Sequence, residues 1–129
     1  MEGRKKVLVI DDEPDMVEMI SMALDREFEV ITAYNGKEGV YKAQKEKPDA
    51  IVLDIMMPEK DGFTACRELK ADSRTASIPV LILTGVGEYF GRSKYARRNG
   101  LEIEAEDFLA KPVDPQELLR RVQALMAPK

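Results

Sequence analysis

Short apolar runs that alternate with longer amphipathic stretches constrain the fold of this 129-residue chain more than any other feature. Runs of this length, rich in Val, Ile and Leu, are typical of strands buried on both faces of a sheet. Strands that alternate with helices favour a parallel sheet covered by helices on both sides, with right-handed crossovers. The sequence therefore predicts a doubly wound α/β fold whose five strands include residues 7–10, 28–33, 50–53, 80–83 and 108–110.

The stretches between these runs carry helical patterns that begin at turn-forming residues. Pro14 suits the first turn of a helix that we expect to extend to about Arg26. Further helices are expected over residues 37–45 and 63–71, and a last one is expected to be capped by Asp114-Pro115.

The predicted strands and the segment before the last of them are not all alike. Residues 28–33 have mixed polarity, which predicts an edge strand. Between the fourth and fifth strands, residues 89–99 carry only part of a helical pattern, and residues 101–106 alternate like an exposed strand or an acidic loop.

Composition and charge narrow the class of protein. A net charge of −4 does not support a nucleic-acid-binding surface, which requires a basic stripe. The chain contains no histidine, so it has no histidine metal site and cannot itself be a phosphohistidine donor. Cys66 is the only cysteine and is expected to pack as a small hydrophobic residue. We read no signal peptide and no membrane span, so a cytoplasmic protein is expected.

Polar side chains stand where the predicted strands end. Asp11 and Asp12 follow the first strand, Asp54 the third, Thr84 the fourth and Lys111 the fifth. Because ligands of open parallel sheets bind at the carboxyl ends of the strands, we expect these five side chains to meet in one crevice.

Three carboxylates that lie close together repel one another, and a hard divalent cation relieves that repulsion. Mg²⁺ prefers oxygen ligands and keeps several waters, so a few carboxylates suffice to bind it. A carboxylate can act as a nucleophile toward phosphorus, while a lysine and a hydroxyl stabilise charge on the transferred oxygens. The set of residue types therefore indicates Mg²⁺-dependent formation of an aspartyl phosphate.

The motifs that carry these residues resemble those of the receiver domains of two-component response regulators. The resemblance covers about residues 6–126, and its elements are Val9-Ile10-Asp11-Asp12-Glu13-Pro14, Leu53-Asp54-Ile55-Met56-Met57-Pro58, Asp61-Gly62, Leu83-Thr84-Gly85 and Asp107-Phe108-Leu109-Ala110-Lys111-Pro112. It implies a flavodoxin-like sheet with strand order 2-1-3-4-5. We expect residues 1–129 to form a single receiver domain, with no output domain in this chain.

The resemblance implies a role for each matching residue. Asp54 would be the phosphoacceptor. Asp12 and Asp54 would bind Mg²⁺ (Mn²⁺ could substitute), Asp11 would bind it largely through water, and the backbone carbonyl of Met56 would be a further ligand.

Further roles follow from the same resemblance. Thr84 and Lys111 would contact the phosphoryl group, and Phe108 would be an aromatic switch residue that moves inward as Thr84 moves toward the phosphate. The Lys111-Pro112 peptide bond would be cis, and the side chains of Met56 and Val86 would tune dephosphorylation.

The implied partners are proteins. The donor would be a sensor histidine kinase or a histidine phosphotransfer protein, and the phosphorylated domain would control a downstream protein of unknown identity. We expect no direct binding of nucleic acid or membrane by this domain, and either a monomer or a weak dimer. The kinase, the pathway and the output are not encoded in any motif of the chain.

Each site residue also has a purely structural interpretation. Asp12 could cap the first helix, Asp54 could be a loop residue, Thr84 could satisfy a backbone group, and Lys111 could be a surface lysine. Phe108 could be an ordinary core residue, with or without a role as a switch.

Two other functions compete with the switch. A phosphohydrolase with an aspartyl-phosphate intermediate uses similar residue types, but it typically has a second Asp two residues after the nucleophile, where this chain has Met56. A binding module that never uses phosphate is the other alternative, although all five site positions are present. Catalysis with multiple turnovers is therefore not expected.

One departure from the family pattern lies between Thr84 and Lys111. That interval is longer than expected by a little more than one helical turn. We expect the extra residues to reshape the surface that partners contact and to leave the chemistry intact.

Overall fold

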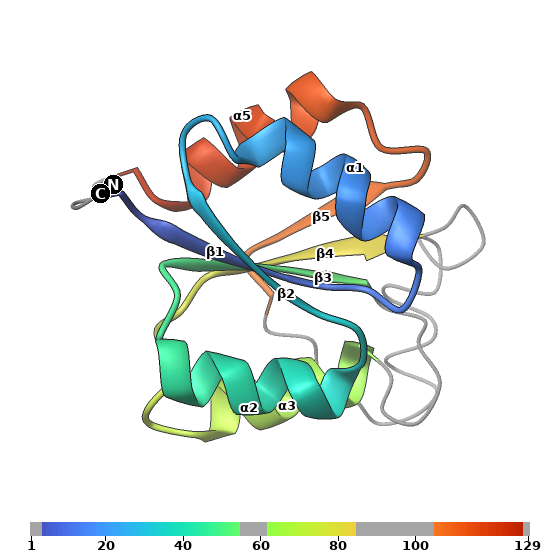
Figure 1. Ribbon diagram of the computed structural model, residues 1–129. Helices are drawn as coiled ribbons and strands as arrows, with labels where there is room; N and C mark the ends of the chain where they lie inside the picture. The colour runs from blue at the N-terminus through green and yellow to red at the C-terminus, as the bar shows by residue number, and fades with distance from the viewer. Residues whose placement is uncertain (1–3, 55–61, 85–104, 128–129) are drawn as a thin grey trace.

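The computed structural model describes residues 4–54, 62–84 and 105–127. Five parallel strands form one sheet in the order β2-β1-β3-β4-β5. Their bounds are β1 Lys6–Ile10, β2 Glu29–Ala33, β3 Ala50–Asp54, β4 Val80–Thr84 and β5 Asp107–Ala110. The predicted flavodoxin-like order is confirmed, and β2 is an edge strand as expected (Figure 1).

Four helices of the described residues cover the two faces of the sheet. They are α1 Pro14–Leu24, α2 Gly36–Glu46, α3 Gly62–Ala71 and α5 Pro115–Leu125. Helices α1 and α5 lie on one face, and α2 and α3 lie on the other (Figure 1). The doubly wound architecture is therefore confirmed.

Two local predictions differ from the structure. Helix α1 ends at Leu24 rather than near Arg26, because the chain turns over residues 25–27, where the carbonyl oxygen of Leu24 accepts from the amide of Glu27 over 3.1 Å as well as from that of Phe28 over 3.0 Å. Asp114 stands at the N-cap position of α5, but its side chain makes no capping hydrogen bond. The helical pattern over residues 89–99 and most of the alternating stretch 101–106 lie outside the described residues.

The sheet is buried on both faces, as the apolar runs indicate. Val7 and Val9 pack toward α1 and α5, whereas Leu8 and Ile10 pack toward α2 and α3. All four side chains are at most 1% exposed. This alternation fixes the register of β1 in the sheet, because a shift by one residue would exchange the two faces. It therefore also fixes where the carboxyl end of the strand lies.

Helix α2 lies directly against β1 at Gly39. A Cβ atom at this position would lie 2.4 Å from Cδ1 of Ile10, which is far inside van der Waals contact. The absence of a side chain at Gly39 therefore sets how closely α2 approaches the sheet.

No helix among the described residues is both long enough and apolar enough to cross a membrane.

Candidate functional site

The predicted site residues lie together at the carboxyl edge of the sheet. Strands β1 and β3 are neighbours whose register pairs Ile10 with Leu53, which places Asp11 beside Asp54. Strand β4 follows on the other side of β3, and its last residue, Thr84, pairs with Ala110 of β5. The next residue of the chain is Lys111, so four separate segments converge on one crevice.

Three carboxylates form a compact cluster in this crevice. Asp11, Asp12 and Asp54 each offer one carboxylate oxygen, and these oxygens all lie within 4.8 Å of one another. Asp11 is fully buried and Asp54 is 2% exposed. Such closely spaced buried acids repel one another strongly because little water screens them.

Lys111 supplies the positive charge that the structure places beside this cluster. Its Nζ donates to Oδ1 of Asp54 over 2.9 Å. The Lys111 side chain is 22% exposed, so it reaches the buried carboxylate from the rim of the crevice. One ammonium leaves the three carboxylates incompletely neutralised.

The effect of burial and crowding on the pKa of a carboxyl group is clearest at Asp11. Burial, the largest cause, and the neighbouring charge of Asp54 raise the pKa of its carboxyl to about 7, against a smaller lowering by the backbone N–H of Glu13. Oδ1 accepts that hydrogen bond over 3.0 Å, whereas the buried Oδ2 has no hydrogen-bond partner within the described part of the chain. A buried acceptor of this kind is suited to a cation or its water.

The donor set fits a hard divalent cation. All three candidate ligands are carboxylates, which Mg²⁺ prefers over nitrogen or sulfur ligands. A divalent charge would also supply what the single ammonium of Lys111 leaves uncompensated.

Thr84 ends β4 with its side chain fully buried. Its Oγ1 has no hydrogen-bond partner among the described residues, so the hydroxyl is available to donate to an oxygen of a bound group. Its carbonyl oxygen accepts from the amide of Lys111 over 2.6 Å, which ties the two site residues together.

The other predicted site residues that the structure describes lie on or near β5. The Lys111–Pro112 peptide bond is cis, as the family resemblance implies. Phe108 is half-buried and packs against the core cluster on the side of α2 and α3. Met56 and Val86 lie outside the described residues.

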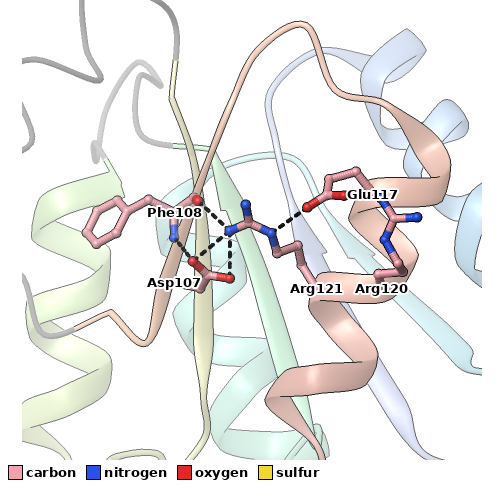
Figure 2. A network of polar contacts seen from close by, with 5 residues as sticks. All are labelled: Asp107, Phe108, Glu117, Arg120 and Arg121. Atoms are coloured by element: carbon pink, nitrogen blue, oxygen red, sulfur yellow. Dashed lines mark hydrogen bonds and ion pairs between the residues drawn. The ribbon is translucent and has the colours of Figure 1, made fainter.

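Strand β5 is held in place by ion pairs whose acids stand at its amino end. Arg121 of α5 donates to Oδ1 and Oδ2 of Asp107 over 2.9 and 3.0 Å and to the carbonyl oxygen of Phe108 over 3.2 Å. Figure 2 shows that the same guanidinium also reaches Glu117, one helical turn earlier. This network ties β5 to α5.

On the other side, Glu106 binds Lys70 of α3, with 3.0 Å between Oε2 and Nζ. No role for the side chains of Glu106, Asp107, Lys70 and Arg121 was expected from the sequence alone. The pair of acids at the start of a short apolar strand points to Glu106 and Asp107, but it does not identify Lys70 or Arg121 as their partners.

Comparison with known proteins agrees with this geometry. A family model described as the response regulator receiver domain matches residues 7–123. The chain is 41% identical over 123 residues to the alkaline phosphatase synthesis transcriptional regulatory protein PhoP of Bacillus subtilis, which covers 95% of this chain and 48% of that protein. The chain thus spans about half the length of this curated relative.

Solved structures of response regulators also match nearly the whole chain. A putative response regulator from Chloroflexus aurantiacus has a TM-score of 0.84 at 32% identity, covering 97% of this chain and 99% of that one. Chemotaxis protein CheY4 of Vibrio cholerae has a TM-score of 0.80 at 31% identity, covering 95% and 99%. The chain belongs to the family of response regulator receiver domains of two-component systems.

Proposed function

We propose that this receiver domain is a switch that is turned on when Asp54 accepts a phosphoryl group in a Mg²⁺-dependent reaction. The observation that carries the proposal is the contact of 2.9 Å between Lys111 and Asp54 inside a cluster of three acids. The phosphoacceptor, its cation-binding neighbours and its charge-stabilising lysine thereby stand in one crevice.

Asp54 acts as the nucleophile. One of its carboxylate oxygens forms a bond to the phosphorus of a phosphohistidine, and the bond from that phosphorus to the imidazole nitrogen breaks, so that the imidazole leaves with the electron pair and takes up a proton. These 129 residues contain no histidine, so the donor histidine lies outside them, on a sensor histidine kinase or a histidine phosphotransfer protein.

Asp11, Asp12 and Asp54 would hold the Mg²⁺ ion, with the backbone carbonyl of Met56 as a further ligand. When bound, the ion neutralises charge on the phosphoryl oxygens. Lys111 stabilises the same charge from the rim of the crevice, and the hydroxyl of Thr84 donates to a phosphoryl oxygen. The Thr84 hydroxyl has no hydrogen-bond partner within the described residues, which supports this role.

The readout is a shift between two conformations. Phosphorylation draws Thr84 toward the phosphate, which makes room for Phe108 to move inward and changes the surface near β5. The half-buried position of Phe108 in the structure supports a side chain with room to move. The changed surface controls a downstream protein.

The domain is not a conventional enzyme with multiple turnovers, because its product is its own phosphorylated form. The Bacillus subtilis relative is a transcriptional regulatory protein of alkaline phosphatase synthesis. For this chain we propose only that the output passes through a protein contact of the receiver domain.

Intact mass after incubation with acetyl phosphate tests the proposal. We expect one phosphoryl adduct on the wild-type protein with Mg²⁺, none without Mg²⁺, and none on Asp54→Asn. If the wild type forms no adduct while it still binds Mg²⁺, a phosphorylated histidine kinase is supplied as donor. Failure with that donor as well would favour a binding module that works without phosphate.

A further inference from the structure

We propose that Glu106 and Lys70 form a positioning pair for the phosphorylation site, because they hold the register of β5 and so keep Lys111 beside Asp54. The inference rests on the proposed function for its catalytic consequence. Its structural part, the placement of Lys111, is argued from the contacts of Glu106 and Lys70 and does not depend on that function.

Glu106 extends the hydrogen bonding between β4 and β5 at the amino ends of the two strands. Its backbone amide donates to the carbonyl oxygen of Val80 over 3.0 Å, and its Oε1 accepts from the amide of Val80 over 2.7 Å. Backbone and side chain of one residue therefore satisfy both polar groups of the first residue of β4. A shift of β5 by one position would break both bonds.

Lys70 fixes the other carboxylate oxygen of Glu106. Its Nζ donates to Oε2 of Glu106 over 3.0 Å and to the carbonyl oxygens of Ile78 and Ala76 over 2.8 and 3.2 Å. These bonds use all three donors of an ammonium group whose side chain is only 8% exposed. The cation is thus anchored to the segment that leads into β4, and Glu106 is anchored to the cation.

The apolar residues of β5 specify its register only weakly. The strand has four residues and lies at the edge of the sheet. Phe108 packs on one face and Leu109 on the other, so a shift by one position exchanges one apolar residue for another. Polar contacts must then select the register.

The register decides whether Lys111 can reach Asp54. A shift by one residue displaces a strand by about 3.3 Å, which is more than the length of the ion pair between these two side chains. The ion pair of Lys111 cannot hold this register by itself, because the carboxylate of Asp54 changes when it is phosphorylated. An anchor at the opposite end of β5 keeps its partners in both states.

Glu38 offers a matched control elsewhere in the chain. Its Oε1 also accepts from a backbone amide, that of Tyr34, over 2.7 Å, and its Oε2 pairs with Lys42 over 3.2 Å. These contacts lie in α2 and the residues just before it, and they touch neither β4 nor β5. Glu38→Ala removes the same kinds of bonds as Glu106→Ala without affecting the register of β5.

The test compares amide hydrogen exchange and phosphorylation in the two variants. In Glu106→Ala we expect the amide of Lys111, which bonds to Thr84, to exchange on the order of tenfold faster, while amides of β1 and β3 are unchanged. Phosphorylation by acetyl phosphate should slow on the order of tenfold, while Mg²⁺ should bind at least as tightly as to the wild type, because the three carboxylates are untouched and Lys111 competes less for Asp54. Glu38→Ala should show neither effect.

Milder variants keep the test decisive if Glu106→Ala folds poorly. Glu106→Gln retains an acceptor for Val80, and Lys70→Met removes only the cation, so each should give a smaller change in the same direction. Exchange at Lys111 that matches the wild type in all three variants would overturn the proposal. If the wild type cannot be phosphorylated at all, the proposed function fails, but exchange at Lys111 still decides this inference.

Discussion

Lys111 Nζ lies 2.9 Å from Asp54 Oδ1, although 57 positions separate the two residues in the chain. The contact joins the end of an edge strand to the centre of the sheet. It also places a cation where a divalent metal would share the same carboxylate, so in the proposed reaction Lys111 would both assist phosphorylation and compete with Mg²⁺ for Asp54.

Replacing Lys111 should therefore separate metal binding from phosphorylation. In Lys111→Met we expect tighter binding of Mg²⁺, because the competing charge is gone, and phosphorylation slower on the order of 100-fold, because a group that stabilises the transferred oxygens is lost. Calorimetric titration with Mg²⁺ and the rate of adduct formation measure the two effects.

Lys42→Met is a suitable control for that experiment. Lys42 pairs with Glu38 and donates to the carbonyl oxygen of Thr32 over 2.6 Å, so it too is a hydrogen-bonded lysine, but it lies on α2. It should change neither quantity. Weaker Mg²⁺ binding in Lys111→Met would contradict the idea of competition.

The raised pKa of Asp11 predicts how stability depends on pH without Mg²⁺. Between the ordinary pKa of 3.8 and about 7, the folded state keeps a proton on Asp11 that the unfolded chain has lost. Stability contributed by this group is therefore present at low pH and is lost as pH rises through about 7. The loss at pH 8 should amount to a few kcal/mol at most, at about 1.4 kcal/mol for each tenfold difference in proton affinity.

Urea unfolding in EDTA from pH 5 to pH 8 measures this effect. Asp11→Asn should be more stable than the wild type at pH 8 and should flatten the profile, because it removes the buried charge. Asp25→Asn, which alters an exposed carboxylate at the end of α1, should leave the profile as it is. Saturating Mg²⁺ should abolish the advantage of Asp11→Asn. A wild-type profile that rises toward pH 8 in EDTA would count against the buried charge.

Gly39→Ala should destabilise the protein although alanine is the better helix former. A Cβ atom at residue 39 would lie 2.4, 2.8 and 2.9 Å from Cδ1, Cγ1 and Cγ2 of Ile10, so turning Cδ1 away about χ2 would leave the overlap with the two Cγ atoms. The expected cost is about 1–3 kcal/mol, which exceeds the gain of about 1 kcal/mol in helix propensity. Thermal unfolding with Mg²⁺ present measures it.

Ile10→Val provides the matching rescue, because it removes the Cδ1 atom that a new Cβ would meet first. The double variant should lose less stability than the two single changes added together, as expected for residues in contact. Additive losses would mean that α2 moves away from β1 as a unit instead of being blocked at Ile10.

The strands and the site could be predicted from the sequence for the same physical reason. A strand buried on both faces must be apolar throughout, so the first polar residue after it, such as Asp11 or Asp54, marks the edge of the sheet. Parallel pairing then brings these residues together without any knowledge of side-chain packing. The end of α1 was missed by two residues because Asp25 and Arg26 can continue a helix, whereas in the structure the chain turns there and buries Phe28.

The contacts that hold β5 could not be predicted in this way. The pairing of Glu106 with Lys70 depends on α3 and the start of β5 lying side by side, which neither segment encodes alone. The same holds for Asp107 and Arg121 (Figure 2). Charged residues are common on surfaces, so their pairing becomes visible only when the fold is known.

The phosphoryl group on Asp54 should be long-lived, with a lifetime of minutes or more. Hydrolysis needs a water molecule oriented toward the phosphorus, and the family resemblance assigns that task to the residues two positions after Asp54 and Thr84. Met56 and Val86 occupy these positions, and neither side chain can hydrogen-bond water well. Loss of the adduct by intact mass, after excess acetyl phosphate is removed, gives the lifetime. Met56→Asn and Val86→Asn should shorten it, whereas Met22→Asn, at an exposed position of α1, should not. A short lifetime that persists in both variants would show that another group orients the water.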